Sequence, residues 1–177
     1  MRSKPLLNLP LFTSFPAFFL AFFLTFFLAL TTITASAQTI SISDTVLKMP
    51  LAEDVSMDDA VDSMKLRANA LNFKLVAELP LSKELEAMGV ESGRIGIYQF
   101  CDARIANEML QFNPDFAAYL PCRIALIEDT DGKAWLVTLD LGKIIPGANL
   151  PPELMEKAEL VRDNIESIMT AGANGDL

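Results

Sequence analysis

The feature that most constrains this chain is an almost wholly apolar run near its N-terminus, Phe15–Leu30. Arg2 and Lys4 precede the run, and Ala35-Ser36-Ala37 follows it. A positive start, an apolar middle and a small-x-small end are typical of a secretory signal peptide. We therefore expect residues 1–37 to be a signal peptide that is cleaved off, and the protein to be periplasmic or secreted.

An uncleaved membrane anchor is the alternative. Counted from Leu6, the apolar run reaches the roughly 20 residues that span a bilayer. The small residues at 35–37 favour cleavage, because signal peptidase requires small side chains before the cut. Removing 37 of the 177 residues leaves 140, which is enough for one domain with a hydrophobic core. We expect residues 38–177 to form that single domain, with no membrane association after cleavage.

The charge balance excludes whole classes of partner. The chain has 23 Asp and Glu residues against 14 Lys and Arg residues, a net charge of −9. Loss of residues 1–37 would remove two basic residues and no acidic one, which brings the net charge to −11. Such a surface repels phosphate backbones and anionic membranes. We therefore expect no nucleic-acid binding, and a partner that is a small molecule or another protein.

The absence of histidine limits the chemistry. Histidine is the commonest general base and the commonest metal ligand. Mechanisms of the Ser-His-Asp or Cys-His type are therefore excluded within this chain. The sequence also shows no phosphate-binding loop and no cluster of metal ligands. We expect no catalytic residue, no metal and no cofactor, and we favour a protein that is not an enzyme.

Hydrophobic periodicity predicts five strands and four helices in residues 38–177. Period-two patterns and β-branched residues indicate strands, whereas apolar residues three and four positions apart indicate helices. Asp129–Gly132 is typical of a hairpin turn between the last two strands, and residues 142–152 are expected to be a loop. The pattern favours an α+β fold of two layers, a mainly antiparallel sheet with helices on one face. The expected strands are 39–49, 73–79, 94–100, 123–128 and 133–141, and the expected helices are 56–71, 82–88, 102–112 and 152–171, with a frayed tail from residue 172.

Three segments resemble a known family. They are residues 98–103 (Tyr-Gln-Phe-Cys-Asp-Ala), 120–124 (Leu-Pro-Cys-Arg-Ile) and 72–76 (Asn-Phe-Lys-Leu-Val). Their order and spacing are similar to those of the domain-of-unknown-function 302 family over residues 53–141. The resemblance implies an α+β fold and a homodimer, and it implies no established activity. Asp102 stands where the family usually has Asn, and Ala77-Glu78 replaces a region where many members carry a histidine.

The two cysteines, Cys101 and Cys122, are the candidate functional pair. In an exported protein they most simply form a structural disulfide, worth about 3 kcal/mol in the loop-entropy model. A redox or soft-metal thiolate pair and two unpaired buried thiols are the alternatives. If their strands are antiparallel the thiols lie at the same end of the sheet. The dipole of the helix capped by Asp102 would lower the pKa of Cys101, and the Asp102 charge would oppose this effect.

Arg123 lies next to Cys122 and could hold a small anion near Cys101, although such residues are more often solvated or ion-paired. Taken together, these features favour an exported module of uncharacterised activity that binds a small ligand or a protein partner. A thiol-disulfide or soft-metal protein and a structural subunit of a cell-envelope complex are the alternatives. A ligand-binding module predicts an apolar cleft, a redox protein predicts accessible sulfurs at one end of the sheet, and a structural subunit predicts a large exposed apolar patch.

Overall fold

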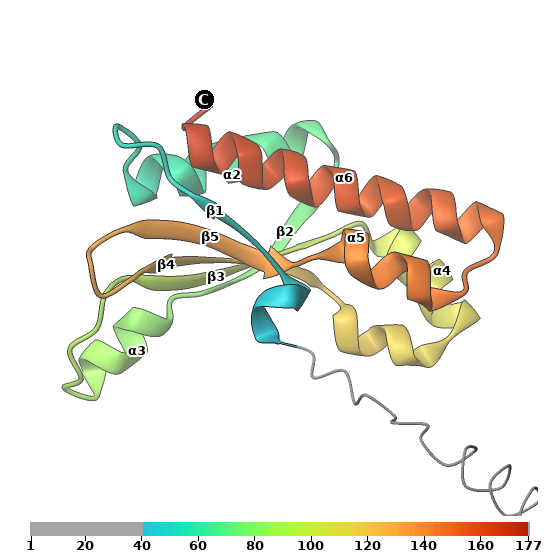
Figure 1. Cartoon of the computed structure of the whole chain (residues 1–177), viewed down its shortest axis with the longest axis horizontal. Helices are drawn as coiled ribbons and strands as arrows, with labels where there is room; N and C mark the ends of the chain where they lie inside the picture. Colours follow the sequence, from blue (N-terminus) through green and yellow to red (C-terminus); the bar gives the residue numbers. More distant parts are fainter. Residues whose placement is uncertain (1–40, 177) are drawn as a thin grey trace, which may run out of the picture. The chain divides into compact units, whose positions relative to one another are not determined.

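The computed structural model describes residues 41–176, and the predicted signal peptide lies outside this range. One sheet of five strands forms the centre of the domain, in the order β1-β5-β4-β3-β2 (Figure 1). Every neighbouring pair is antiparallel. The strands are β1 (Val46–Pro50), β2 (Lys74–Leu79), β3 (Ile95–Cys101), β4 (Cys122–Glu128) and β5 (Ala134–Leu139).

Two long helices cover one face of this sheet, which we call the inner face (Figure 1). They are α2 (Met57–Ala70) and α6 (Pro152–Asn174), and shorter elements lie at the ends of the strands. The predicted α+β fold of two layers is confirmed. The remaining elements are η1 (Ile42–Thr45), α3 (Leu81–Ala87), α4 (Ala103–Phe112), η2 (Pro114–Tyr119), α5 (Leu141–Ile144) and η3 (Ile145–Ala148).

The core lies between the inner face and the two long helices. Tyr98 and Phe100 of β3 are buried, whereas the residues that alternate with them, Ile97, Gln99 and Cys101, are half-exposed on the opposite, outer face. Successive side chains of a strand alternate between faces, so this pattern defines both faces along the whole sheet. The largest fully buried apolar side chains come from the inner face, from the two covering helices and from Phe73 just before β2: Phe73, Phe100, Met64, Ile124, Leu126, Leu136, Ile165, Ile168 and Met169.

The helix starts follow the predicted capping residues. The Ser56 hydroxyl accepts a hydrogen bond from the backbone N–H of Asp59 at 3.1 Å, which starts α2. Gly132 takes a positive φ of 76° in the predicted hairpin between β4 and β5. Within residues 41–176, no helix combines the length and the apolar character that a bilayer span requires.

Three predictions about local structure were wrong: the start of the first strand, the loop at residues 142–152 and the frayed tail from residue 172. The first strand starts only at Val46, because residues 42–45 form the 3-10 helix η1. Residues 142–152 are not an open loop, since α5 and η3 occupy 141–148. Leu141, Ile144 and Ile145 have helical spacing and face the interior there, a signal that Pro146 and two glycines obscure in the sequence.

The tail is not frayed at residue 172 either. Helix α6 continues to Asn174, and Gly172 is buried where α6 crosses α2. A Cβ atom at Gly172 would lie 2.6 Å from Cγ of Met64 and 3.1 Å from the carbonyl oxygen of Ala60. The glycine is therefore needed for the close approach of the two helices, and it does not mark the end of α6.

Candidate functional site

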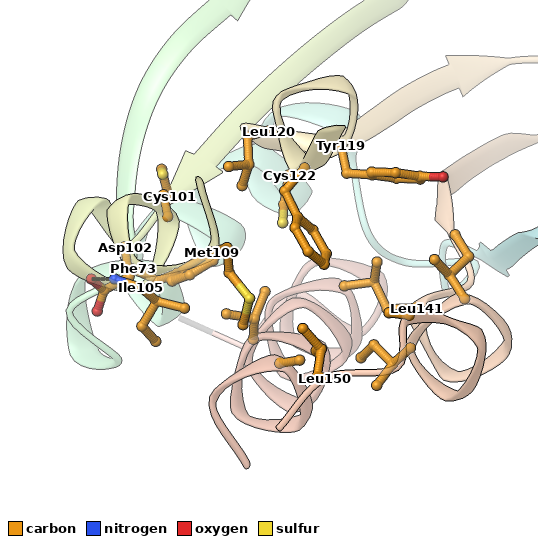
Figure 2. Close-up of a pocket in the computed structure, with 17 residues that line it drawn as sticks. Phe73, Cys101, Asp102, Ile105, Met109, Tyr119, Leu120, Cys122, Leu141 and Leu150 are labelled. Atoms are coloured by element: carbon orange, nitrogen blue, oxygen red, sulfur yellow. Dashed lines mark hydrogen bonds between the residues drawn. The ribbon is translucent and has the colours of Figure 1, made fainter. Parts of the chain in front are cut away.

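An apolar pocket lies at the end of the sheet where β3 ends and β4 begins (Figure 2). Helices α4 and α6 and the short elements η2, α5 and η3 enclose it. Its volume is about 90 Å³, and about 690 Å³ when the open mouth is included. The lining is almost wholly apolar: Phe73, Cys101, Asp102, Ile105, Ala106, Met109, Phe116, Tyr119, Leu120, Cys122, Leu141, Ile144, Ile145, Ala148, Leu150, Ala158 and Val161.

Helix α4 forms one wall of the pocket. Asp102 caps this helix, because its Oδ1 accepts hydrogen bonds from the backbone N–H groups of Arg104 at 2.9 Å and Ile105 at 3.2 Å. The cap sets the start of the helix, and its spacing then turns Ile105 and Met109 towards the pocket (Figure 2). Among residues 41–176, Asp102 is the only charged residue that lines the pocket.

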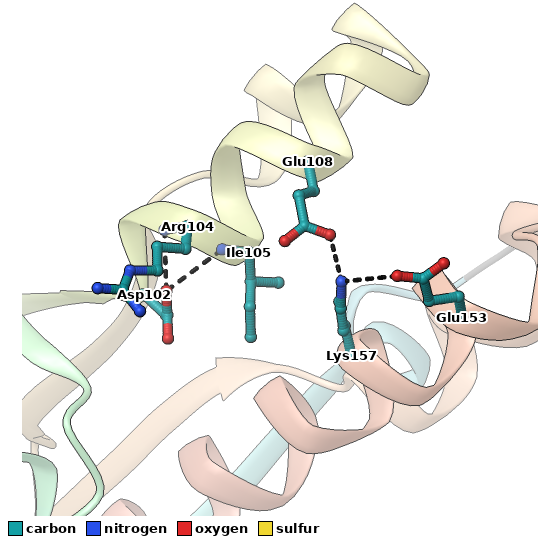
Figure 3. Close-up of polar contacts among 6 residues, drawn as sticks. All are labelled: Asp102, Arg104, Ile105, Glu108, Glu153 and Lys157. Atoms are coloured by element: carbon teal, nitrogen blue, oxygen red, sulfur yellow. Dashed lines mark hydrogen bonds and ion pairs between the residues drawn. The ribbon is translucent and has the colours of Figure 1, made fainter.

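An ion-pair network joins this wall to α6 (Figure 3). The ammonium group of Lys157 contacts the carboxylate of Glu108 on α4, and it lies 3.2 Å from Oε1 of Glu153 on its own helix. Hydrogen bonds to Glu108 and then to Glu153 raise the pKa of Lys157. Lys157 is thus held in its charged form between the two helices, at the outside of the pocket.

A more polar hollow adjoins the pocket between η2 and η3. Asn113 and Asp115 line it, together with Phe116 and Tyr119, which also line the apolar pocket. The side chain of Asn113 accepts a hydrogen bond from the backbone N–H of Asp115 at 2.9 Å, which starts η2. The shared lining residues indicate that the pocket opens towards solvent between η2 and η3.

The two cysteines are at the same end of the sheet, as the antiparallel alternative predicts, and both thiols are free. In the β3–β4 register, Cys122 is opposite Phe100, so Cys101 is displaced by one residue from the position opposite Cys122. A shift of one residue places side chains on opposite faces of a sheet. Figure 2 shows the thiol of Cys122 pointing into the pocket and that of Cys101 pointing away. This geometry does not support the predicted structural disulfide.

Both thiols are held in the protonated form near neutral pH. Burial, and secondarily the charge of Cys101, raises the pKa of Cys122 from 9.0 to about 11. Burial and then the charge of Asp102 raise the pKa of Cys101. The helix dipole of α4 therefore does not lower the pKa of Cys101 below its ordinary value. Because the thiolate is the nucleophile and the metal ligand, these shifts disfavour a redox or soft-metal role.

The two predicted neighbours of the cysteines occupy different places. Asp102 lines the pocket, whereas Arg123 is exposed on the outer face and does not line it. Among residues 41–176, no group of three or more acidic, cysteine or histidine side chains is placed to bind a metal.

The sequence patterns did not predict most of the residues that line the pocket. Phe116 and Tyr119 lie in η2, just after the Asn113-Pro114 break, and Ile144 and Ala148 lie in the segment that was expected to be a loop. The only available signal was the concentration of apolar residues in both segments, since solvent-exposed loops rarely need them.

Comparison with known proteins agrees with the resemblance of the sequence motifs. The family model described as "Domain of unknown function DUF302" matches residues 48–172. The chain belongs to this family. Its structure is similar to that of an uncharacterized conserved protein DUF302 from Bacillus stearothermophilus, with a TM-score of 0.61 and 15% sequence identity over 72% of this chain and 97% of the other. At this identity the likeness shows the fold alone. No curated protein matches the chain.

Proposed function

We propose that this DUF302 domain is an exported, non-enzymatic module that binds a small apolar molecule in the pocket between α4, η2, η3 and α6. The observation that carries this proposal is the nearly complete apolar lining of a partly open pocket. Ligand sites are concave and mainly apolar, with few polar groups. The volume of about 90 Å³ is smaller than the roughly 300–1,000 Å³ of sites for drug-sized ligands, so the ligand is a small apolar molecule or one that extends through the open mouth.

The chemistry of the lining favours binding over catalysis. Oδ1 of Asp102, the charged residue of the lining, is occupied by the helix cap. The Cys122 thiol is protonated near neutral pH because burial raises its pKa to about 11. Neither group is prepared to accept a proton or attack a substrate. A ligand would gain about 0.8 kcal/mol for each methylene group it buries.

The test is a titration with N-phenyl-1-naphthylamine, a neutral dye whose fluorescence rises in apolar sites. We expect saturable binding at one site. Ala106→Phe places a ring in the pocket from the wall formed by α4, and we expect it to weaken dye binding at least tenfold. Ala103→Phe is the matched control, because Ala103 is on the same helix, is exposed and does not line the pocket.

A second readout uses the pocket thiol. A bound ligand covers Cys122, so dye at saturation is expected to slow the alkylation of Cys122 measured by mass spectrometry. Equal dye affinity in both Phe variants, with each variant shown by circular dichroism to be folded, would contradict the proposal. Dye binding that leaves the alkylation of Cys122 unchanged would also contradict it, because the dye would then bind elsewhere.

A further inference from the structure

The outer face of the sheet carries apolar side chains where a solvated sheet carries polar ones. The register places Ile97, Ala125 and Val137 in one row across the three central strands. All three are half-exposed, and neither hydrophobic cluster of the core includes a residue from this face. An antiparallel sheet with one face in water alternates apolar with polar residues. The neighbouring row is also apolar and half-exposed: Ile95, Ile127 and Trp135.

The charges on this face differ in sign from those of the protein as a whole. The charged strand residues that the register assigns to the outer face are Lys48, Lys74 and Arg123, and all three are basic and exposed. The register assigns two charged strand residues to the inner face, Glu78 and Glu128, and both are acidic. Among residues 41–176, none of the three basic groups forms an ion pair with a carboxylate. The outer face is thus a basic surface on a chain with a net charge of −9.

Trp135 extends the basic rim at the hairpin end of the face. The ammonium group of Lys48 lies 3.7 Å from the centroid of the indole ring, and that of Lys133 lies 4.5 Å from it. Asp129 is the nearby carboxylate, and its Oδ2 accepts a hydrogen bond from Nε1 of Trp135 at 2.7 Å. The indole therefore holds two cations at the surface and engages the acidic group beside them.

We propose that the outer face docks an acidic protein segment with an apolar centre flanked by carboxylates. Large exposed apolar patches mark interaction sites, and charge complementarity selects the partner. Five strands about 4.8 Å apart place the edge strands β1 and β2 about 19 Å from each other. Lys48 and Lys74 are on these two edges, and the register places them about four residues apart along the strands. An extended segment of about seven residues therefore spans the apolar rows diagonally between them.

Two other occupants fit the charges less well. An anionic membrane is a broad plane, so the net negative charge of the whole protein repels it. A compact acidic segment interacts chiefly with the nearby basic residues of the outer face. A second copy docked face to face would bring the same basic residues, Lys48, Lys74 and Arg123, into the interface without carboxylates from its own strands on that face.

The experiment uses a capped nine-residue peptide with two glutamates at each end and alternating leucine and valine between them. A second peptide has lysines in place of the glutamates. Trp135 is the only tryptophan of the chain, so its fluorescence reports on this face. We expect a saturable change with the acidic peptide and none with the basic one. The double variant Lys48→Glu/Arg123→Glu is expected to bind the acidic peptide at least tenfold more weakly.

Two further variants separate the contributions. Val137→Thr keeps the side-chain shape and the strand preference, and its more polar surface is expected to weaken binding about threefold. Arg67→Glu is the control on α2, which covers the inner face, and it is expected to leave binding unchanged. Thermal unfolding of each variant checks that the domain is folded, so that a loss of binding is not a loss of structure.

Equal responses to the two peptides, or no response to either, would overturn the proposal. Light scattering and vesicles of one part phosphatidylglycerol to three parts phosphatidylcholine test the other occupants. Self-association that the double variant abolishes would assign the face to a second copy. Vesicle binding without peptide binding would assign it to a membrane. Either result would overturn the acidic-segment proposal.

Discussion

Replacement of Gly172 by alanine is expected to destabilise the domain, although helix propensity alone predicts the opposite. Alanine in place of glycine within a helix stabilises by about 1 kcal/mol. At Gly172, however, the new Cβ would meet Cγ of Met64 at 2.6 Å and two further atoms at 3.1 Å, one of them the backbone oxygen of Ala60. Overpacking in a close-packed core costs about 1–3 kcal/mol. Three tight contacts favour the upper part of that range, so the expected net loss is about 1–2 kcal/mol.

Urea unfolding followed by circular dichroism measures this loss. Gly147→Ala is the control, because an added Cβ at Gly147 would meet no atom within 4 Å, and its free energy of unfolding is expected to change by less than about 0.5 kcal/mol. A double-mutant cycle with Met64→Ala is expected to show a coupling of about 2 kcal/mol, since the smaller side chain relieves the clash. A Gly172→Ala protein as stable as the wild type, or more stable, would refute the close packing of α2 against α6.

Two predictions concern pH. Burial raises the pKa of Cys122 from 9.0 to about 11, so the folded state holds this proton more tightly than the unfolded state. The resulting stability is complete below pH 9 and is lost by pH 11. Over that interval the wild type is expected to lose about 2 kcal/mol more unfolding free energy than Cys122→Ala, and parallel curves for the two proteins would contradict the burial of the thiol. The Trp135 hydrogen bond, followed by backbone hydrogen bonds, lowers the pKa of Asp129 below its ordinary 3.8. Acid titration of Trp135 fluorescence should therefore show a step below pH 3.8 that Asp129→Asn removes, and a step that persists in this variant would show that another group is responsible.

The parts of the fold that local chemistry determines could be predicted from the sequence. Ser56 and Asp102 both cap helices where a polar residue precedes an apolar period, and the Asp-Gly turn joins β4 to β5 as expected. Gly172 could not be understood in this way, because a glycine near the end of a helix normally indicates a stop. Its role depends on Met64, more than a hundred positions away, which no local pattern connects to it.

The candidate site was less predictable for the same reason. The sequence identifies Cys101 and Cys122 as a candidate pair but does not decide whether they share one end of the sheet. The antiparallel pairing of β3 and β4 places them there, in a register that shifts them by one residue. The pocket assembles from segments that contact one another only in the folded chain. Its apolar side chains carry no motif, because a surface that binds apolar molecules is made of the same residues as a core.

The two faces of the sheet impose different demands on the same strands, and this bears on how the domain can work. The inner positions Tyr98 and Phe100 of β3 and Ile124 and Leu126 of β4 are buried, so substitutions there act chiefly on stability. The outer positions carry no such packing role, yet apart from Gln99, Cys101 and Arg123 they are aliphatic, in an acidic protein where polar residues would be more soluble. An apolar face that does not pack in the core is consistent with the binding partner that we propose for it. Because Cys122 borders the pocket and Arg123, the next residue, lies on the outer face, a ligand that shifts β4 would alter both sites. We therefore expect saturation of the pocket with N-phenyl-1-naphthylamine to change the affinity of the acidic peptide, and the peptide to change the affinity of the dye by the same factor, as linkage requires.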